Sequence, residues 1–283
     1  MKYAVCSEIF VEDAPPLAQL VQSRFWSVEK TAALAAELGF QGLEIAPFTL
    51  GPEPLKLSEG ERDQVRNSIQ AAGLQTVGLH WLLSGTQGLH LTSPDPEVRR
   101  KTVAYVQDLV DLCADLGGEL MVWGSPAQRS LLPGVTRQQA ADYALEVWSA
   151  LLPRCEERKV TLAIEPLSPA ETDFLNSAAE TVECIQRLDH PRLRLHLDTK
   201  AMSYETAPVH ETVRAFLPWT AHFHANDPNL KGPGEGDLDH HPIAAELRAA
   251  DYQGWVSVEV FDFQPDPETI ARKAIRYLRE VYR

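Results

Sequence analysis

Residues 160–165 of the chain read Val160-Thr-Leu-Ala-Ile-Glu165, a short apolar run that ends in a carboxylate. The same arrangement, an apolar run closed by a potential metal ligand, recurs three times downstream. A strand plus a crossover helix takes about 30 residues, so this spacing predicts a repeated strand–helix unit. The closing residues lie 33, 26 and 35 positions apart, and the later runs are Leu193-Arg-Leu-His-Leu-Asp198, Thr220-Ala-His-Phe-His224 and Trp255-Val-Ser-Val-Glu259.

Strand-like apolar runs alternate with amphipathic helical patterns along the whole chain. Eight such units in 283 residues predict an α/β fold, a single (β/α)₈ TIM barrel occupying residues 1–283, because such barrels need about 250 residues. The runs are almost continuously apolar, so the strands should be parallel and covered on both faces. They begin near residues 3, 42, 74, 119, 160, 193, 220 and 254.

The helical patterns between the runs carry recognisable start and stop signals. Ser58 with Glu61 has the spacing of a capping box, and Pro153 predicts a kink or break in its helix. Two longer segments, 10–25 and 226–241, follow the first and seventh runs and should lie on the catalytic face of the barrel. The helices are expected at 27–39, 58–73, 96–117, 136–159, 177–190, 208–217, 242–250 and 266–282.

The four closing residues together predict a divalent-metal site. Barrel chemistry gathers where strands meet the following loops, so Glu165, Asp198, His224 and Glu259 should converge at the mouth. Each of them alone could instead be a helix N-cap or half of a salt bridge. Three carboxylates in one place would repel strongly without a cation. One nitrogen and several oxygens favour one Mn²⁺, Mg²⁺ or Co²⁺ ion, with Zn²⁺ as the alternative.

Alternation along the strands places further side chains beneath the predicted ligands. His196 shares a face with Asp198, and His222 shares one with His224. We expect both inner histidines to be buried, hydrogen-bonded residues of the layer below.

Composition narrows the classes of function. The net charge is −14, whereas nucleic-acid binders usually carry a basic face, so a polynucleotide substrate is not expected. No apolar stretch reaches about 20 residues, and the first residues read as a strand rather than a secretory signal, so no membrane association is expected. Four cysteines without paired spacing are typical of reduced thiols in a cytoplasmic protein. Monomer and homo-oligomer are both compatible with the sequence.

The closing motifs resemble those of the xylose-isomerase-like TIM-barrel superfamily of sugar phosphate isomerases and epimerases, within it the ketose 3-epimerase type. The resemblance covers the whole chain in layout and is specific in its second half. It implies that the four closing residues bind one divalent metal ion, and that Glu165 and Glu259 are the proton-transfer pair. The matching motifs are Ile164-Glu165-Pro166-Leu167 with Glu171 and Asn176, His196-Leu-Asp198-Thr199, His222-Phe-His224 with Asp227, Asn229 and Gly232-Pro-Gly-Glu-Gly236, and Val258-Glu259 with Phe261.

Two positions depart from the family pattern. Ala201 stands where ketose epimerases of the family carry a histidine, and Leu230, next to Lys231, stands where they carry an arginine. Both family residues hold substrate oxygens, so substrate contacts at these positions must differ here. The absent histidine also weakens the similarity to the apurinic endonucleases, which use extra histidines to hold zinc ions.

Several other residues are candidates for contact with a small carbohydrate substrate. Lys200 and Lys231 could neutralise an anionic sugar, and Trp123 could stack on a sugar ring. Glu8 and Glu44 fit pocket lining and structural pairing equally well. The full set of expected substrate-binding residues is His80, Trp123, Glu171, Lys200, Asp227 and Lys231.

These residues would support proton transfer next to a carbonyl group. A cation chelated by a carbonyl and its neighbouring hydroxyl would acidify the adjacent C–H and stabilise an enediolate. One glutamate would remove the proton and the other would return one to the opposite face. Isomerisation or epimerisation is the first expectation, and a lyase that dehydrates a keto-sugar or keto-polyol is the alternative. An apurinic endonuclease-like hydrolase and a sugar-binding protein without turnover are further alternatives.

Overall fold

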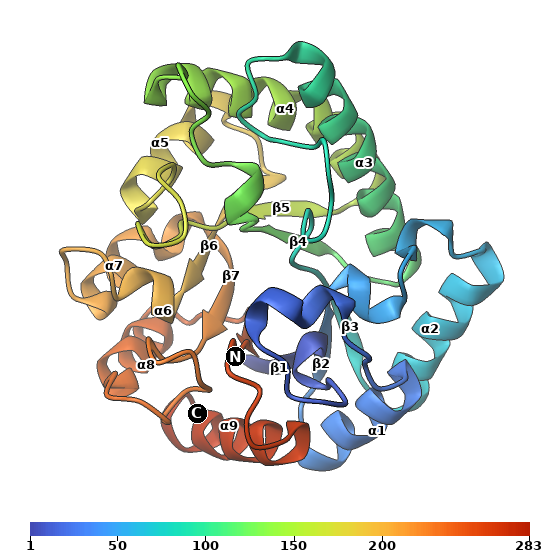
Figure 1. The fold of residues 1–283 in the computed structure, drawn as a ribbon. Coiled ribbons are helices and arrows are strands. Elements are labelled where there is room, and N and C mark those ends of the chain that lie inside the picture. The colour runs from blue at the N-terminus through green and yellow to red at the C-terminus, as the bar shows by residue number, and fades with distance from the viewer.

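Eight parallel strands form a closed barrel at the centre of the molecule, with helices around it (Figure 1). The computed structural model describes residues 1–283. Each strand pairs with the next in sequence, and β1 pairs with β8 to close the barrel. The predicted (β/α)₈ barrel is therefore confirmed. The strands are β1 (Lys2–Cys6), β2 (Gly42–Ile45), β3 (Gln75–Leu79), β4 (Leu120–Trp123), β5 (Thr161–Ile164), β6 (Leu193–Asp198), β7 (Thr220–Ala225) and β8 (Trp255–Val258).

The helices lie close to the predicted ranges, and their ends match the capping residues. Ser27 accepts a hydrogen bond from the Lys30 amide, and Ser58 and Glu61 form the expected capping box. A short helix, α6, directly follows β6 and was not expected. The helices are α1 (Val28–Leu38), α2 (Glu59–Ala71), α3 (Pro96–Asp115), α4 (Arg137–Arg158), α5 (Ala178–Leu188), α6 (Thr199–Met202), α7 (Val209–Phe216), α8 (His240–Ala249) and α9 (Pro267–Val281).

Of the predicted kink or break at Pro153, the break is wrong, because α4 continues through this residue. Proline removes one backbone donor from the helix, which leaves the carbonyl of Ser149 without its partner. Both residues lie on the exposed face of α4, where water can bind the free carbonyl. Leu151 and Leu152 on the buried side keep the helix packed on the barrel.

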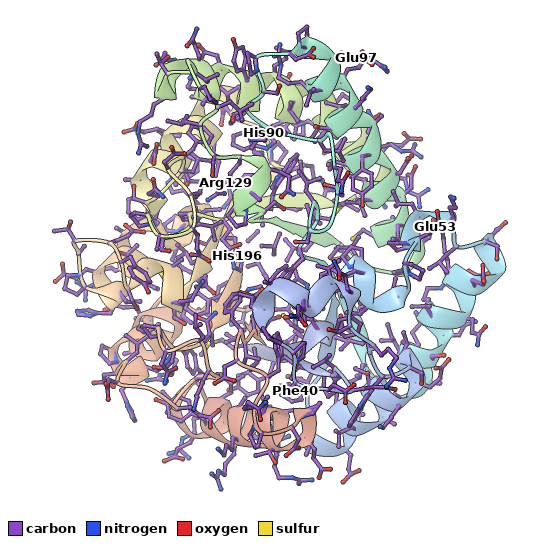
Figure 2. All side chains as sticks on the ribbon, in the orientation of Figure 1. Phe40, Glu53, His90, Glu97, Arg129 and His196 are labelled. Carbon is purple, nitrogen blue, oxygen red and sulfur yellow. The ribbon has the colours of Figure 1, made fainter.

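The hydrophobic core has two parts. A large cluster lies between the strands and the surrounding helices, while five small or branched residues fill the lower barrel interior: Ala4, Val77, Leu120, Val122 and Ala163. Figure 2 shows Arg129 and His196 toward the centre of the molecule and Glu53 and Glu97 at its edge. Val122 of this cluster also lines the pocket at the carboxyl ends of the strands, so the apolar residues lie beneath that pocket.

The two long loops predicted for the catalytic face do lie at the barrel mouth. The segment after β1 contains a 3₁₀-helix, η2 (Leu17–Gln22), and closes on itself through a bridge between Val11 and Phe25. In the loop after β7, Asp227 accepts hydrogen bonds from the amides of Gly234 and Leu238. Leu17 of the first loop and Leu230 of the second line the same pocket.

Two further expectations concern the chain as a whole. All four cysteines are buried and unpaired, as expected for free thiols. None of the helices combines the length and the apolar character that a bilayer crossing requires.

Candidate functional site

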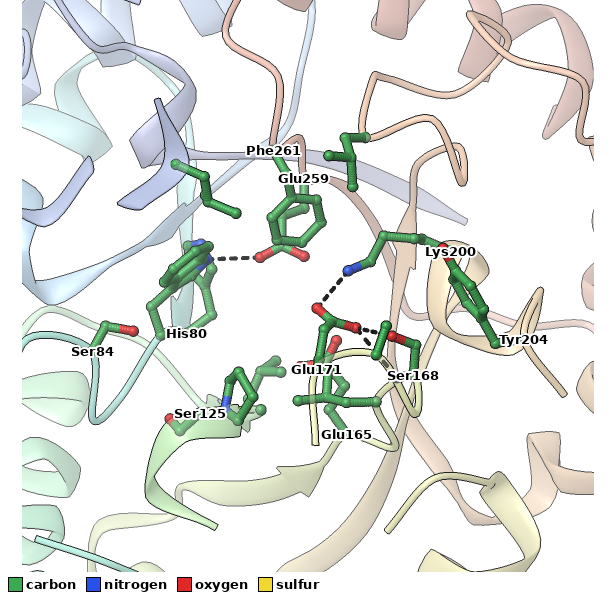
Figure 3. Close-up of a pocket in the computed structure, with 18 residues that line it drawn as sticks. His80, Ser84, Ser125, Glu165, Ser168, Glu171, Lys200, Tyr204, Glu259 and Phe261 are labelled. Atoms are coloured by element: carbon green, nitrogen blue, oxygen red, sulfur yellow. Dashed lines mark hydrogen bonds and ion pairs between the residues drawn. The ribbon is translucent and has the colours of Figure 1, made fainter. Parts of the chain in front are cut away.

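A pocket of about 380 Å³ opens at the carboxyl ends of the strands. Glu165 and Glu259, which follow β5 and β8, both line it, and Figure 3 shows them on opposite sides of the cavity. Strands three apart in an eight-stranded barrel stand nearly opposite one another, so the two carboxylates reach the pocket from different directions. This is the face on which barrel enzymes carry their chemistry.

Three of the four predicted metal ligands lie within reach of one ion. Ligand atoms of Glu165, Asp198, His224 and the deeper His196 all lie within 4.8 Å of one another. The register of β6 and β7 explains part of this proximity, because Asp198 pairs with His224. The fourth predicted ligand, Glu259, places Oε2 3.1 Å from Nδ1 of His224. The structure thus brings all four residues to one place, and cation binding there remains a prediction.

The electrostatics of this cluster favour a bound cation. Burial, together with the nearby carboxylates of Glu259 and Asp198, raises the pKa of Glu165 well above its usual value. Burial also raises the pKa of Asp198 to about 6, and Glu259 adds to the shift. Like charges in a dry site destabilise one another unless a cation or protons neutralise them. A divalent ion among these oxygens would relieve that repulsion, so the residues present suit such an ion.

His224 is oriented by a second buried carboxylate. Its Nε2 lies 3.1 Å from Oε1 of Glu44, which leaves Nδ1 as the atom that faces Glu259 and the pocket. Metal-binding histidines commonly present one ring nitrogen to the metal and the other to a carboxylate, which orients the ring. Burial alone would raise the pKa of Glu44, but His222 and His224 hold it well below the usual value. Glu44 therefore has the structural pairing role.

The layer below the ligands is a buried network of histidines and glutamates. His222 Nε2 lies 2.7 Å from Glu44 Oε2, and His80 Nε2 lies 2.7 Å from Glu8 Oε2, so Glu8 is also a pairing residue. The expectation of a buried, hydrogen-bonded histidine is met at His222. At His196 it is wrong, because the ring is buried but neither nitrogen has a hydrogen-bonding partner. Its nearest carboxylate oxygen, on Glu165, is 4.0 Å away.

Asp198 combines a helix-capping role with its place in the cluster. Oδ1 accepts a 2.7 Å hydrogen bond from the amide of Ala201, the third residue of α6. Oδ2 accepts a 2.6 Å bond from the side-chain amide of Asn226, which follows β7. The N-cap interpretation is therefore correct for this residue, and it does not exclude the metal role. Both bonds hold the carboxylate at the barrel mouth.

Glu259 is positioned by a residue that the sequence did not single out. The indole Nε1 of Trp81 donates a 2.8 Å hydrogen bond to Oε1 of Glu259. Burial alone would raise the pKa of Glu259, but His224 and its hydrogen bond lower it. Glu259 is thus held as an ionised carboxylate with a defined orientation.

Three of the predicted substrate-binding residues line the pocket. They are His80, Glu171 and Lys200. The ammonium of Lys200 lies 2.8 Å from Oε1 of Glu171 and 4.1 Å from the ring centre of Phe261 (Figure 3). The other oxygen of Glu171 accepts a hydrogen bond from the Ser168 hydroxyl. These groups offer a donor and an acceptor to a ligand in the cavity.

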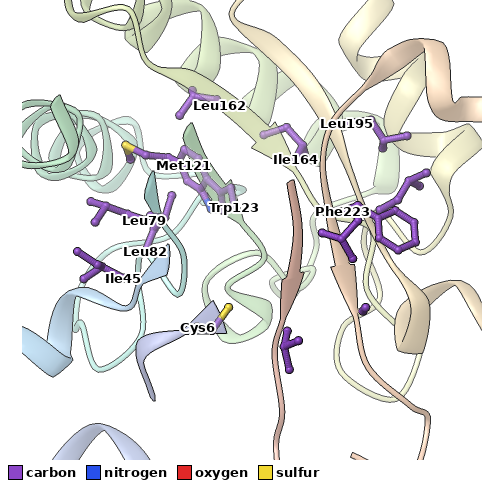
Figure 4. Packing of buried hydrophobic residues seen from close by; sticks show 14 of the residues in the cluster. Cys6, Ile45, Leu79, Leu82, Met121, Trp123, Leu162, Ile164, Leu195 and Phe223 are labelled. Atoms are coloured by element: carbon purple, nitrogen blue, oxygen red, sulfur yellow. The ribbon is translucent and has the colours of Figure 1, made fainter. Parts of the chain in front are cut away.

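The other three predicted substrate residues lie outside the pocket. Trp123 is fully buried in the hydrophobic core, among the side chains labelled in Figure 4, because its position in β4 points it away from the cavity. Asp227 is buried, and both of its carboxylate oxygens accept hydrogen bonds from backbone amides of its own loop. Lys231 points to solvent, 4.0 Å from Asp262. The structure thus does not bring these three residues to the pocket, and their contact with substrate stays a prediction.

Sequence reasoning also missed residues that shape the site. The buried guanidinium of Arg129 donates hydrogen bonds to the backbone carbonyls of Glu165 (2.6 Å) and Leu175 (3.1 Å). Leu17 and Tyr204 line the outer pocket. The only available signal for Arg129 was that it is the single charged residue between β4 and α4, and nothing local marked the other two.

Comparisons with known proteins identify similar sequences and a similar fold. The chain is 27% identical over 269 residues to a probable ketose 3-epimerase from Synechocystis sp., covering 88% of each protein. It is 27% identical to a D-psicose 3-epimerase from Agrobacterium fabrum, covering 80% of this chain and 76% of that protein. A solved D-psicose 3-epimerase with D-tagatose from Clostridium cellulolyticum H10 superimposes with a TM-score of 0.85 at 20% identity, covering 100% and 99% of the two chains. At that identity, the superposition shows a shared fold.

A family model described as a xylose isomerase-like TIM barrel matches residues 32–281. The match includes the second to eighth strands and all four predicted ligands. On this basis, the chain belongs to the xylose isomerase-like TIM barrel family.

Proposed function

We propose that this protein is a divalent-metal-dependent epimerase or isomerase that acts on a small carbohydrate or keto-polyol. One observation carries the proposal: Glu165 and Glu259 enter a single pocket from opposite sides, beside Asp198 and His224. Relatives that cover most of the chain are named ketose 3-epimerase and D-psicose 3-epimerase, which supports this reaction class.

Glu165, Asp198, His224 and Glu259 would hold the ion, and Mn²⁺, Mg²⁺ or Co²⁺ suits their mainly oxygen donors. A bound divalent cation supplies polarisation of a substrate carbonyl, which acidifies the neighbouring C–H. Glu44 fixes the His224 ring and Trp81 fixes the Glu259 carboxylate, so two of the four residues are pre-oriented.

The two glutamates divide the proton transfer between them. One carboxylate removes the proton from the carbon beside the carbonyl, the electron pair of the C–H bond forms a carbon–carbon double bond, and the π pair of the carbonyl moves onto its oxygen. The other glutamate, on the far side of the pocket, delivers a proton to the opposite face of the same carbon, which inverts its configuration. Groups positioned for general acid–base catalysis typically contribute about 10²–10⁴-fold each.

The polar groups in the pocket favour a neutral polyol over a phosphodiester. Lys200 is the only lysine or arginine in the lining, and its charge is already paired with Glu171. Polynucleotide binding depends on several cations that neutralise phosphates. His80, Glu171 and Lys200 can instead exchange hydrogen bonds with sugar hydroxyls.

The test is solvent-deuterium incorporation into a panel of ketoses. The metal-loaded protein is incubated with each sugar in D₂O, and NMR reports deuterium and configuration at the carbon beside the carbonyl. We expect deuterium incorporation for at least one sugar, with inversion if the protein is an epimerase and with a shift of the carbonyl to the neighbouring carbon if it is an isomerase. The chelated protein and the Glu259→Gln variant serve as controls.

Two outcomes would overturn the proposal. Absence of deuterium incorporation in every sugar, with metal occupancy confirmed by elemental analysis, would remove the epimerase and isomerase assignment. A product lighter by one water would identify a dehydratase built on the same proton abstraction.

A further inference from the structure

The exposed apolar side chains of this protein gather at one place. Leu17, Tyr204 and Leu230 are the only large hydrophobic residues that are exposed, with exposed fractions of 39%, 52% and 40%. All three line the mouth of the pocket that contains Glu165 and Glu259. Single exposed hydrophobic residues are ordinary on a protein surface, but a cluster at a binding cavity indicates an apolar ligand group.

The three residues, named here the apolar rim, come from separate parts of the chain. Leu17 lies in η2 after β1, Tyr204 follows α6, and Leu230 lies in the loop after β7. No local pattern brings them together, and only closure of the barrel places their loops around one opening. Each could have turned toward the core of its own loop, as neighbouring apolar residues do.

Leu230 is held at the rim by a constrained backbone. Its φ of 73° lies in the left-handed region, which is unfavourable for leucine. Its amide donates to the Asp227 carbonyl at 3.0 Å, and its own carbonyl accepts from the amides of Phe261 at 2.8 Å and Asp262 at 2.9 Å. These bonds fix the direction of the side chain, so its exposure is built into the loop.

The pocket changes character from its inner to its outer end. The inner end carries the carboxylates of Glu165 and Glu259 and the pair formed by Lys200 and Glu171. Trp81 and Phe261, with ring centres 6.0 Å apart, form an aromatic wall next to them. A cavity of about 380 Å³ falls in the range of about 300–1,000 Å³ that holds drug-sized ligands, so its volume accommodates more than a small polyol.

We propose that the pocket takes a keto-sugar that carries an apolar substituent, as in a keto-glycoside with an apolar aglycone. The sugar occupies the inner end, and the substituent lies against the apolar rim. Leu17, Tyr204 and Leu230 are then specificity-determining residues. This assignment of substrate class rests on the proposed function.

The test measures binding separately from turnover. Methyl, butyl and hexyl 3-keto-β-D-glucopyranosides are titrated into the Mn²⁺-loaded protein by calorimetry, and reaction products are followed in parallel by NMR. Because a fully buried methylene contributes about 0.8 kcal/mol, or about fourfold in affinity, we expect two- to fourfold tighter binding per added methylene. An affinity that does not change with chain length would overturn the proposal.

The rim variant Leu17→Ser/Tyr204→Ser/Leu230→Asn should abolish the gain from the alkyl chain and leave binding of the methyl compound unchanged. Leu230→Asn alone should remove part of the gain in affinity from the alkyl chain. Asparagine suits a left-handed backbone, so this single variant can be tested even if the triple variant does not fold. Leu132→Asn is the matched control, because Leu132 is half-buried in another loop, outside both the pocket and the core cluster. An unaltered chain-length dependence in the triple variant would contradict the assignment.

Two outcomes distinguish failure of the apolar subsite from failure of the proposed function. If binding depends on chain length but neither these glycosides nor any sugar of the ketose panel incorporates deuterium, the proposed function fails and the apolar subsite stands. If the glycosides are converted but their affinity does not depend on chain length, the proposed function stands and the apolar subsite fails. Light scattering tests the competing occupant, a second copy of this chain. If the rim variant changes the oligomeric state and the alkyl chain has no effect on binding, the rim is a subunit contact and the proposal fails.

Discussion

The guanidinium of Arg129 donates a 2.6 Å hydrogen bond to the backbone carbonyl of Glu165, at the point where this residue leaves β5. A second bond, of 3.1 Å, reaches the carbonyl of Leu175, whose φ of 59° is unfavourable for leucine. Arg129 is fully buried, so neither carbonyl has water as a substitute partner. The loop after β4 thereby sets the backbone from which the Glu165 carboxylate reaches the pocket.

Arg129→Met should lower the free energy of unfolding by about 2–4 kcal/mol, because two buried carbonyls lose a charged donor. It should also weaken Mn²⁺ binding, since Glu165 loses its backbone anchor. Urea unfolding and calorimetric titration measure the two effects, and Arg129→Lys should recover part of both. Unchanged metal affinity in a destabilised Arg129→Met protein would restrict this arginine to a purely structural role.

Metal binding should stabilise the folded protein and depend on Asp198 and His224. Adding Mn²⁺ at about 100 times its dissociation constant should stabilise the wild type by about 2.7 kcal/mol, seen as a rise in Tm. Asp198→Asn and His224→Ala should lose most of this rise and all activity. The exposed Asp108 on α3 offers the control Asp108→Asn. A wild-type response to metal in either site variant would show that the residue is not a ligand.

The two glutamates should each be required for proton exchange and not for retention of metal. An amide oxygen can still coordinate a cation but cannot accept a proton. Glu165→Gln and Glu259→Gln should therefore keep measurable metal occupancy and lose deuterium wash-in during a single turnover. If one variant exchanges the proton at the wild-type rate, that glutamate is not the base. If both variants do, another residue such as His80 must be the base.

Asp227 should act on stability with a defined pH dependence. Burial would raise its pKa, but His240 and the amides of Gly234 and Leu238 lower it below the ordinary value. A carboxyl with a lowered folded pKa stabilises the protein above its unfolded pKa of about 3.9, and this stabilisation is lost as the pH falls through the folded pKa.

Asp227→Asn should therefore cost about 1–3 kcal/mol near pH 7, with a gap to the wild type that shrinks below about pH 4. Urea unfolding from pH 3 to pH 7 measures the gap. A difference that is constant across this range would show that the charge of Asp227 does not contribute.

The barrel and the identity of its four closing residues could be read from local patterns. Strand and helix periods, caps such as Ser58 with Glu61, and the spacing of Glu165, Asp198, His224 and Glu259 all depend on nearest neighbours in the chain. Parallel strands of one barrel end on the same face, so residues that close strands meet without further information. The helix through Pro153 departs from its local signal because packing of the buried face outweighs one lost hydrogen bond on the exposed face.

Side-chain direction and loop path needed the tertiary structure. Trp123 also ends a strand, but its side chain lies on the outer face of β4 and packs in the core. Trp81, in the loop after β3, instead donates a hydrogen bond to Glu259. Arg129 and the apolar rim come from other parts of the sequence than the carboxylates of the pocket. Local periodicity is enough to predict the order of the strands and the residues at their ends. Only closure of the barrel, with its register and the backbone geometry of its loops, decides which side chains meet across the mouth.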